Sequence, residues 1–168
     1  MKKAVFLLLA ASFLIFSSCI TTSRNHRALH IDRALKEAAQ HIDSKIDPGT
    51  RIAILNITSP SSRLSTYSID ELQGAILDIG NLVLLDRHSI EQARRELNFQ
   101  HSGEVSDDTM LQAGRRLGAV YVVTGFFLDI TDTYRLVIRV LSVQSGTVEG
   151  QYRTDVLKDT RVRSLVEN

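Results

Sequence analysis

Three strand-length runs follow one another in the last third of the chain, and this arrangement limits the fold more than any other feature. The runs are 119–130, 134–143 and 147–156, and the turns 131–133 and 144–146 separate them. Turns of this length are too short for a crossover connection, so neighbouring runs must pair antiparallel. The sequence therefore predicts an antiparallel meander of three strands.

The second and third runs of this meander alternate between apolar and polar residues. Leu136, Ile138 and Val140 share one parity, which is the pattern of a strand with one buried face. The opposite parity carries polar residues, and we expect it to be partly exposed to solvent. Its charged members are Arg135, Arg139, Glu149 and Arg153.

The first half of the chain alternates helical and strand patterns. Apolar residues at helical spacing predict a helix over 28–45, and 51–57 is a short β-branched run. A second helical stripe runs from Tyr67 to Ile79 and ends at Gly80, and 82–85 is another apolar run. A helix between two short strands predicts a parallel, right-handed β-α-β unit.

Two further helices connect this unit to the meander. Ser89 with Gln92 predicts a capping box for a helix through Leu97, and Ser106 can cap a helix that ends near Leu117. Residues 98–105 form the loop between them. The predicted fold class is α/β with a mixed sheet: a β-α-β unit, two helices and a three-strand meander, with the helices packed on the sheet.

The N-terminus has the pattern of a secretory signal. A basic start, an apolar run over 4–16 and small residues at 17–18 predict a signal peptide over 1–18. The stretch from Phe16 to Cys19 resembles a bacterial lipobox, which makes Cys19 the expected lipid-attachment residue. Phe16 stands where leucine is commonest, so ordinary cleavage with an incidental cysteine is the alternative. We expect a tether over 19–27, a single domain over 28–157 and a tail over 158–168 that forms a short helix or frays.

Composition excludes several classes of function. Without residues 1–18 the chain loses Lys2 and Lys3, which leaves 18 basic and 19 acidic side chains. This balance gives no electrostatic case for nucleic-acid binding. No cysteine follows Cys19, so the mature chain can form neither an internal disulfide nor a cysteine-rich zinc site.

The histidines are the main candidates for chemistry, and we expect none of them to form an active site. His26 and His30 lie four residues apart, but no third metal ligand accompanies them. His88 or His101 could serve a small hydrolase, although no triad is evident in the sequence. We therefore expect no enzyme, no metal and no cofactor.

Several short motifs resemble one protein family. They are Leu84-Leu85-Asp86-Arg87, the helix start Ser89-Ile90, Arg95-Glu96-Leu97, Leu117-Gly118-Ala119 and the strand Tyr121 to Gly125. Together they are similar to the curli-secretion-channel (CsgG) family and its relative LpoB, a lipoprotein activator of a penicillin-binding protein. The resemblance covers about residues 49–156 and gives Asp86, Arg87, Gly118 and Gly125 structural roles.

This resemblance implies a lipoprotein of the outer membrane that faces the periplasm and binds other proteins or self-assembles. The family's channels carry long hairpin insertions, whereas the connections 58–66 and 131–133 are far shorter than two spanning strands of about 9 to 11 residues. We therefore expect a member that forms no pore and regulates an envelope partner, for example a peptidoglycan synthase. The alternative is a homo-oligomeric ring or collar.

The partner-binding residues predicted from the sequence are the polar strand parity and one loop residue. Arg135, Arg139, Glu149 and Arg153 form the first group. Phe99 is an apolar side chain in the otherwise polar loop 98–105, and it either packs onto the core or anchors a partner.

Overall fold

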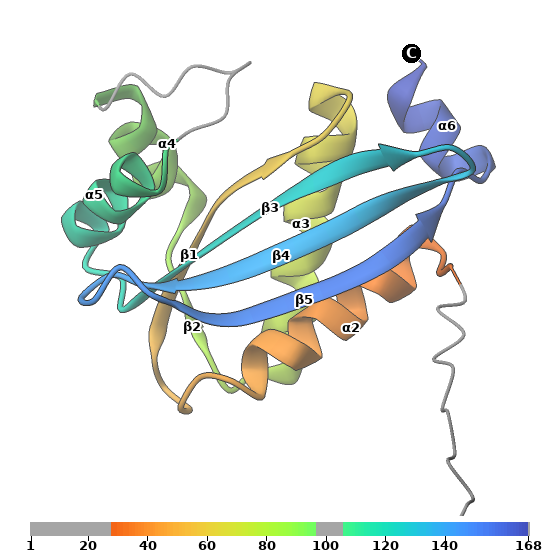
Figure 1. The fold of residues 1–168 in the computed structure, drawn as a ribbon. Helices are drawn as coiled ribbons and strands as arrows, with labels where there is room; N and C mark the ends of the chain where they lie inside the picture. Colours follow the sequence, from red (N-terminus) through yellow and green to blue (C-terminus); the bar gives the residue numbers. More distant parts are fainter. Residues whose placement is uncertain (1–27, 97–105, 168) are drawn as a thin grey trace, which may run out of the picture.

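A five-stranded mixed sheet organises the fold, and helices cover it on both faces (Figure 1). The structure is a computed structural model that describes residues 28–96 and 106–167. The strands lie in the order β2-β1-β3-β4-β5. Their bounds are Arg51–Thr58 for β1, Val83–Leu84 for β2, Tyr121–Ile130 for β3, Thr133–Ser142 for β4 and Val148–Leu157 for β5.

Strand pairing confirms the predicted fold class. β1 pairs in parallel with β2 and with β3. β3, β4 and β5 form the antiparallel meander. The helix between β1 and β2 completes the β-α-β unit, because parallel neighbours need a crossover connection.

The helices divide between the two faces of the sheet. Helices α2 (Ile31–Asp43), α3 (Ser62–Ile79) and α6 (Thr160–Val166) contribute to one apolar core. Helices α4 (Arg87–Glu96) and α5 (Asp107–Leu117) contribute to a second core on the opposite face. No described helix is both long and apolar enough to span a bilayer.

The larger core lies beneath the apolar face of the three-strand meander. Leu136, Ile138 and Val140 are each no more than 1% exposed, and they pack with Leu35 of α2 and Leu72 of α3. Full burial of an aliphatic side chain stabilises a fold by about 1.5 to 3 kcal/mol. The smaller core joins Ala53, Leu55, Val122 and Leu141 of the sheet to residues of α4 and α5.

The predicted N-cap of α4 was wrong. Ser89 is not the cap, because α4 begins at Arg87 and the Asp86 carboxylate accepts hydrogen bonds from the Ser89 backbone N–H at 3.0 Å and from its hydroxyl at 2.5 Å. Asp and Ser are both good N-cap residues, and the sequence offers one of each, Asp86 and Ser89, three positions apart. In the structure the Asp86 carboxylate accepts from an N–H of the first helical turn that has no partner within the helix.

Two other predicted boundaries differ from the structure. The helix expected over 28–45 is shorter, because Leu29 forms a parallel bridge with Val156 of β5. Helix α3 begins at Ser62, inside the expected connection 58–66, and the Ser61 hydroxyl caps it by accepting from the Leu64 N–H.

Candidate protein-binding surface

Half of the second sheet face carries no helix among the described residues. Helices α4 and α5 lie at one end of the sheet (Figure 1), where they pack on Val122 and Leu141. Farther along the strands, the residues of the same parity form rows across β3, β4 and β5. We call this region the open sheet face and define it as Phe126, Leu128, Ile130, Arg135, Val137, Arg153, Asp155 and Leu157.

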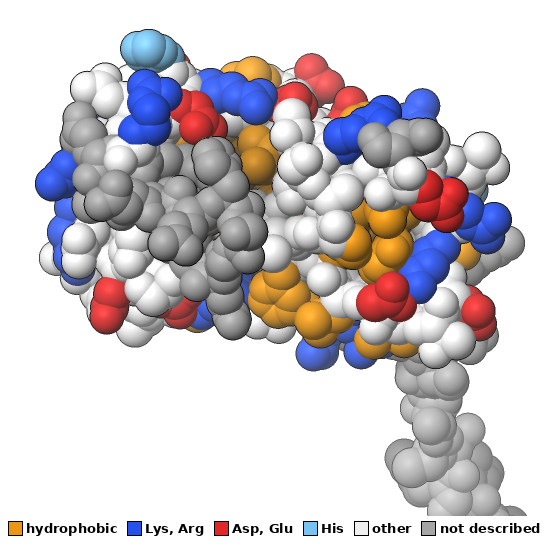
Figure 2. Space-filling view, turned by 90° about the horizontal axis from the view of Figure 1, so that it is seen from above, with side chains coloured by type: hydrophobic (Ala, Val, Ile, Leu, Met, Phe, Trp, Pro, Cys, Tyr) orange, Lys and Arg blue, Asp and Glu red, His pale blue; other side chains and the backbone are white. Residues whose placement is uncertain are grey.

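Apolar side chains occupy much of the open sheet face. Leu128 is 48% exposed and Ile130 is 40% exposed, both on β3. Phe126 lies directly opposite Val137, which is only 5% exposed, and Val137 lies opposite Arg153, so the exposed apolar area comes mainly from β3. Figure 2 shows apolar patches beside basic and acidic side chains on the surface seen from above. Clustered exposed apolar groups with a charged rim are typical of surfaces that bind other proteins.

The predicted binding arginines have different environments. Arg135 makes two hydrogen bonds to the Asp155 carboxylate, at 2.9 and 3.3 Å, and this contact raises the pKa of the Arg135 guanidinium. Arg139 holds Asp107 of α5 through two hydrogen bonds, at 3.2 and 2.8 Å. Two parallel bonds fix a guanidinium in one orientation. Arg135 thus stands rigidly on the open sheet face, while Arg139 ties the sheet to α5.

The other two predicted binding residues lie on β5, and both are exposed. Glu149 accepts a hydrogen bond from the Thr147 hydroxyl at 2.7 Å. Arg153 has no ion-pair or hydrogen-bond partner among the described residues. Arg153 is therefore the cation of this set that remains available to a partner.

The residues expected to have structural roles make local contacts. Hydrogen bonds from Ser89 hold the pKa of Asp86 below its usual range. Arg87 forms an ion pair with Asp70, which joins α4 to α3. Gly118 ends α5 in the left-handed region with a φ of 67°, where a side chain would be strained. A Cβ at Gly125 would lie 2.6 Å from Ile138 Cδ1.

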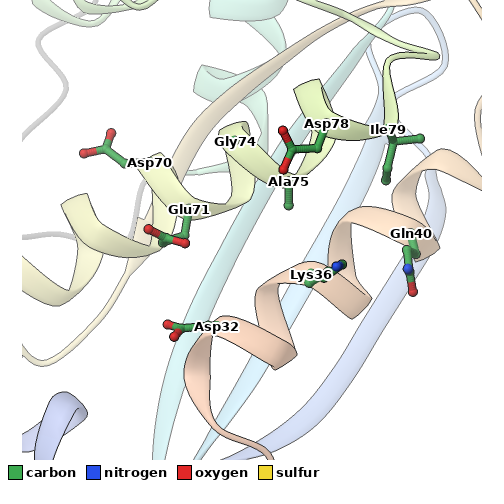
Figure 3. Close-up of a pocket in the computed structure, with 9 residues that line it drawn as sticks. All are labelled: Asp32, Lys36, Gln40, Asp70, Glu71, Gly74, Ala75, Asp78 and Ile79. Atoms are coloured by element: carbon green, nitrogen blue, oxygen red, sulfur yellow. The ribbon is translucent and has the colours of Figure 1, made fainter.

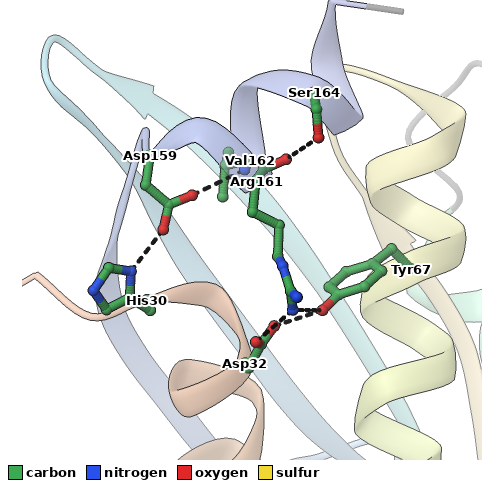
Figure 4. Close-up of polar contacts among 7 residues, drawn as sticks. All are labelled: His30, Asp32, Tyr67, Asp159, Arg161, Val162 and Ser164. Atoms are coloured by element: carbon green, nitrogen blue, oxygen red, sulfur yellow. Dashed lines mark hydrogen bonds and ion pairs between the residues drawn. The ribbon is translucent and has the colours of Figure 1, made fainter.

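A polar contact that the sequence analysis missed lies where the chain enters the domain (Figure 4). His30 Nδ1 lies 2.6 Å from Oδ2 of Asp159, and Oδ1 of Asp159 accepts from the Val162 N–H as the N-cap of α6. Partial burial raises the pKa of Asp159, but the hydrogen bonds from Val162 and His30 outweigh burial and lower it overall. An aspartate three residues before Val162 is the cap signal that could have predicted this helix start.

A second cluster joins α2, α3 and α6 beside this contact. The Tyr67 hydroxyl donates to Asp32 at 2.5 Å, and Arg161 donates to Asp32 at 2.6 Å and to the Tyr67 oxygen at 2.8 Å (Figure 4). Burial, followed by the hydrogen bond to Asp32, raises the pKa of Tyr67 to about 12. These contacts link three helices, so the cluster serves the fold.

A groove of about 440 Å³ lies between α2 and α3 (Figure 3). Its acidic residues are Asp32, Asp70, Glu71 and Asp78, and Lys36 is its only basic one. Asp32 is held by Tyr67 and Arg161, and Asp70 by Arg87. Among the described residues, no group of three side chains could hold a metal ion.

Other predicted candidates are not brought together by the fold. His88 is exposed near the start of α4, and His30 contacts Asp159. Cys19, His26, Phe99 and His101 lie outside the described residues.

Comparison with known proteins identifies similar sequences and folds. The family model for the peptidoglycan-synthase activator LpoB matches residues 53–153, more than half of the 168-residue chain. No curated protein sequence matches the chain.

The solved structures with a similar fold include three of LpoB. The LpoB C-terminal domain from Escherichia coli has 13% identity and a TM-score of 0.65, with 77% of this chain and 100% of that chain covered. The same domain from Salmonella enterica has 14% identity and a TM-score of 0.61, covering 77% and 96%. The NMR structure of E. coli LpoB has 13% identity and a TM-score of 0.65, covering 82% and 73%.

Proposed function

This chain belongs to the LpoB family of peptidoglycan-synthase activators, and from that premise we propose that it activates a peptidoglycan synthase by binding it through the open sheet face. The match over residues 53–153 carries the proposal, because it includes β3, β4 and most of β5. The partner expected from the sequence analysis is a penicillin-binding protein.

The chemistry of the open sheet face supports this role. Leu128 and Ile130 offer apolar area, and Arg153 offers a cation beside it, whereas Arg135 is held by Asp155. A partner with an apolar ridge flanked by carboxylates would match this surface, because apolar anchors provide binding energy and rim charges orient the complex.

We further propose that the chain acts by binding and not by catalysis. The two described histidines that could suggest chemistry have other environments: His30 contacts Asp159 and His88 is exposed. The connections between β1 and α3 and between β3 and β4 span only 59–61 and 131–132, which supports a member that forms no channel.

The proposed location is the periplasmic side of the outer membrane, with a lipid on Cys19 as the anchor. The signal pattern of residues 1–18 and the resemblance to a lipobox support this location.

A reconstituted synthase assay tests the proposed surface. We expect Leu128→Arg to reduce activation of the synthase about tenfold or more, because it places a charge at the centre of an apolar contact. Leu77→Arg is the matched control: Leu77 is 61% exposed on α3, away from the open sheet face. Equal activation by the two variants would reject the surface, and no activation by the unaltered chain would reject the function.

A further inference from the structure

Strand β5 is the outer strand of the sheet, with helix α2 running beside it (Figure 1), and apart from β4 the only described strand pairing on β5 is a bridge at Leu29. At one end, Leu29 donates a backbone hydrogen bond to Asp155 at 2.8 Å and accepts one from Leu157 at 2.9 Å. These two bonds show that the backbone groups of Asp155 and Leu157 point away from β4. Because strand residues alternate, the backbone groups of Gln151 and Arg153 point outward as well.

The outward groups of Gln151 and Arg153 have no hydrogen-bond partner in the part of the chain that the structure describes. Uncovered strand edges are templates for pairing, and proteins block them with proline, charged side chains, a β-bulge, a covering segment or a very short strand. β5 is 10 residues long and contains no proline, and its own devices are a bulge at Glu149 and the charged side chains that select the register of a partner strand.

Charge decides which antiparallel register a second copy of this edge could adopt. Pairing Arg153 with Arg153 of the other copy would place two like charges opposite each other, and pairing Glu149 with Glu149 would do the same. Centring the pair on Gln151 instead places Arg153 of each copy opposite Glu149 of the other. Glu149 is exposed in the bulge opposite Val140 and Leu141, and Arg153 is exposed with no described partner.

We propose that β5 pairs with the β5 of a second copy around a two-fold axis at Gln151, with two Glu149–Arg153 ion pairs. Gln151 of the two copies then exchanges backbone N–H and C=O hydrogen bonds, as its outward orientation requires. The two sheets become one continuous sheet. A two-fold contact uses the same strand edge on both copies, so the assembly is a closed dimer and not a ring.

Cysteine crosslinking of the intact chain in membranes tests this register. Opposite residues of a hydrogen-bonded antiparallel pair have Cα atoms about 5.5 Å apart, within the range that a disulfide spans. We expect Gln151→Cys to give a disulfide dimer on mild oxidation. Leu128→Cys, at an exposed position of β3, and the unaltered chain, whose single cysteine is Cys19, are the controls.

A charge swap tests the ion pairs in the Gln151→Cys background. Arg153→Glu or Glu149→Arg alone should reduce the dimer about tenfold, since each places like charges opposite one another. The double variant Glu149→Arg with Arg153→Glu should restore it, which a purely structural role would not predict. The proposal is overturned if Gln151→Cys crosslinks no more than Leu128→Cys, or if the double variant fails to recover the dimer. Arg153 also belongs to the open sheet face, so the charge-swap variants are assessed by crosslinking, and the synthase surface is tested separately with Leu128→Arg on β3.

Discussion

At the scale of single residues, Gly125 shows how closely the paired strands β3 and β4 approach each other. An added Cβ would lie 2.6 Å from Ile138 Cδ1 and 2.8 Å from the Val137 carbonyl oxygen. The backbone oxygen cannot rotate away, so we expect Gly125→Ala to lower the free energy of unfolding by about 1 to 3 kcal/mol through overpacking. Urea unfolding followed by circular dichroism measures this.

Gly74 provides the matched control on α3. An added Cβ there meets no atom within 4 Å, and alanine is favoured over glycine inside a helix by about 0.5 to 1 kcal/mol. Gly74→Ala should therefore leave stability unchanged or raise it. If both variants lost the same stability, the close approach at Gly125 would not be the cause.

At the scale of secondary-structure elements, α6 depends on its cap. We expect Asp159→Ala to lower the free energy of unfolding at neutral pH by about 1 kcal/mol, because the Val162 N–H loses its acceptor. The pKa of Asp159 is lowered in the folded chain, so the contribution of its carboxylate is complete above the ordinary aspartate pKa. It is lost as the pH falls through the lowered value.

The difference between Asp159→Ala and the unaltered chain should therefore be largest near neutral pH and narrow in acid. Thermal unfolding of both chains across this pH range provides the comparison. A difference that stays constant as the carboxylate becomes protonated would contradict the assigned role of the cap.

Local sequence patterns predicted the helices and strands well, but they predicted the contacts between these elements poorly. The two-residue period of β4 assigned its buried parity correctly, because Leu136, Ile138 and Val140 face the larger core. Leu29 fitted a helical spacing equally well, and its strand pairing depends on Asp155 and Leu157, more than a hundred residues later. The contacts of Arg135 with Asp155 and of Arg139 with Asp107 likewise depend on register and helix placement, which single-residue patterns do not contain.

At the scale of the whole molecule, the anchor and the binding surface should be separable. The described chain begins beside the end of β5, where Leu29 joins the sheet. The ten residue steps from Cys19 to Leu29 span at most about 33 to 36 Å when fully extended, at about 3.3 to 3.6 Å per residue. A lipid on Cys19 would therefore keep the open sheet face close to the membrane and select partners that reach it.

This separation leads to a prediction for Cys19→Ala. Fatty-acid labelling should mark the unaltered chain and not the variant, and the variant should move from the membrane fraction to the soluble fraction, since acyl chains supply the anchoring free energy. Purified Cys19→Ala should still activate the synthase in solution, because the open sheet face is unchanged, whereas activation in cells should fall with the loss of local concentration. Fatty-acid labelling of both the unaltered chain and Cys19→Ala would show that the lipid is attached at a residue other than Cys19. Loss of activation by the purified variant would show instead that Cys19 takes part in binding.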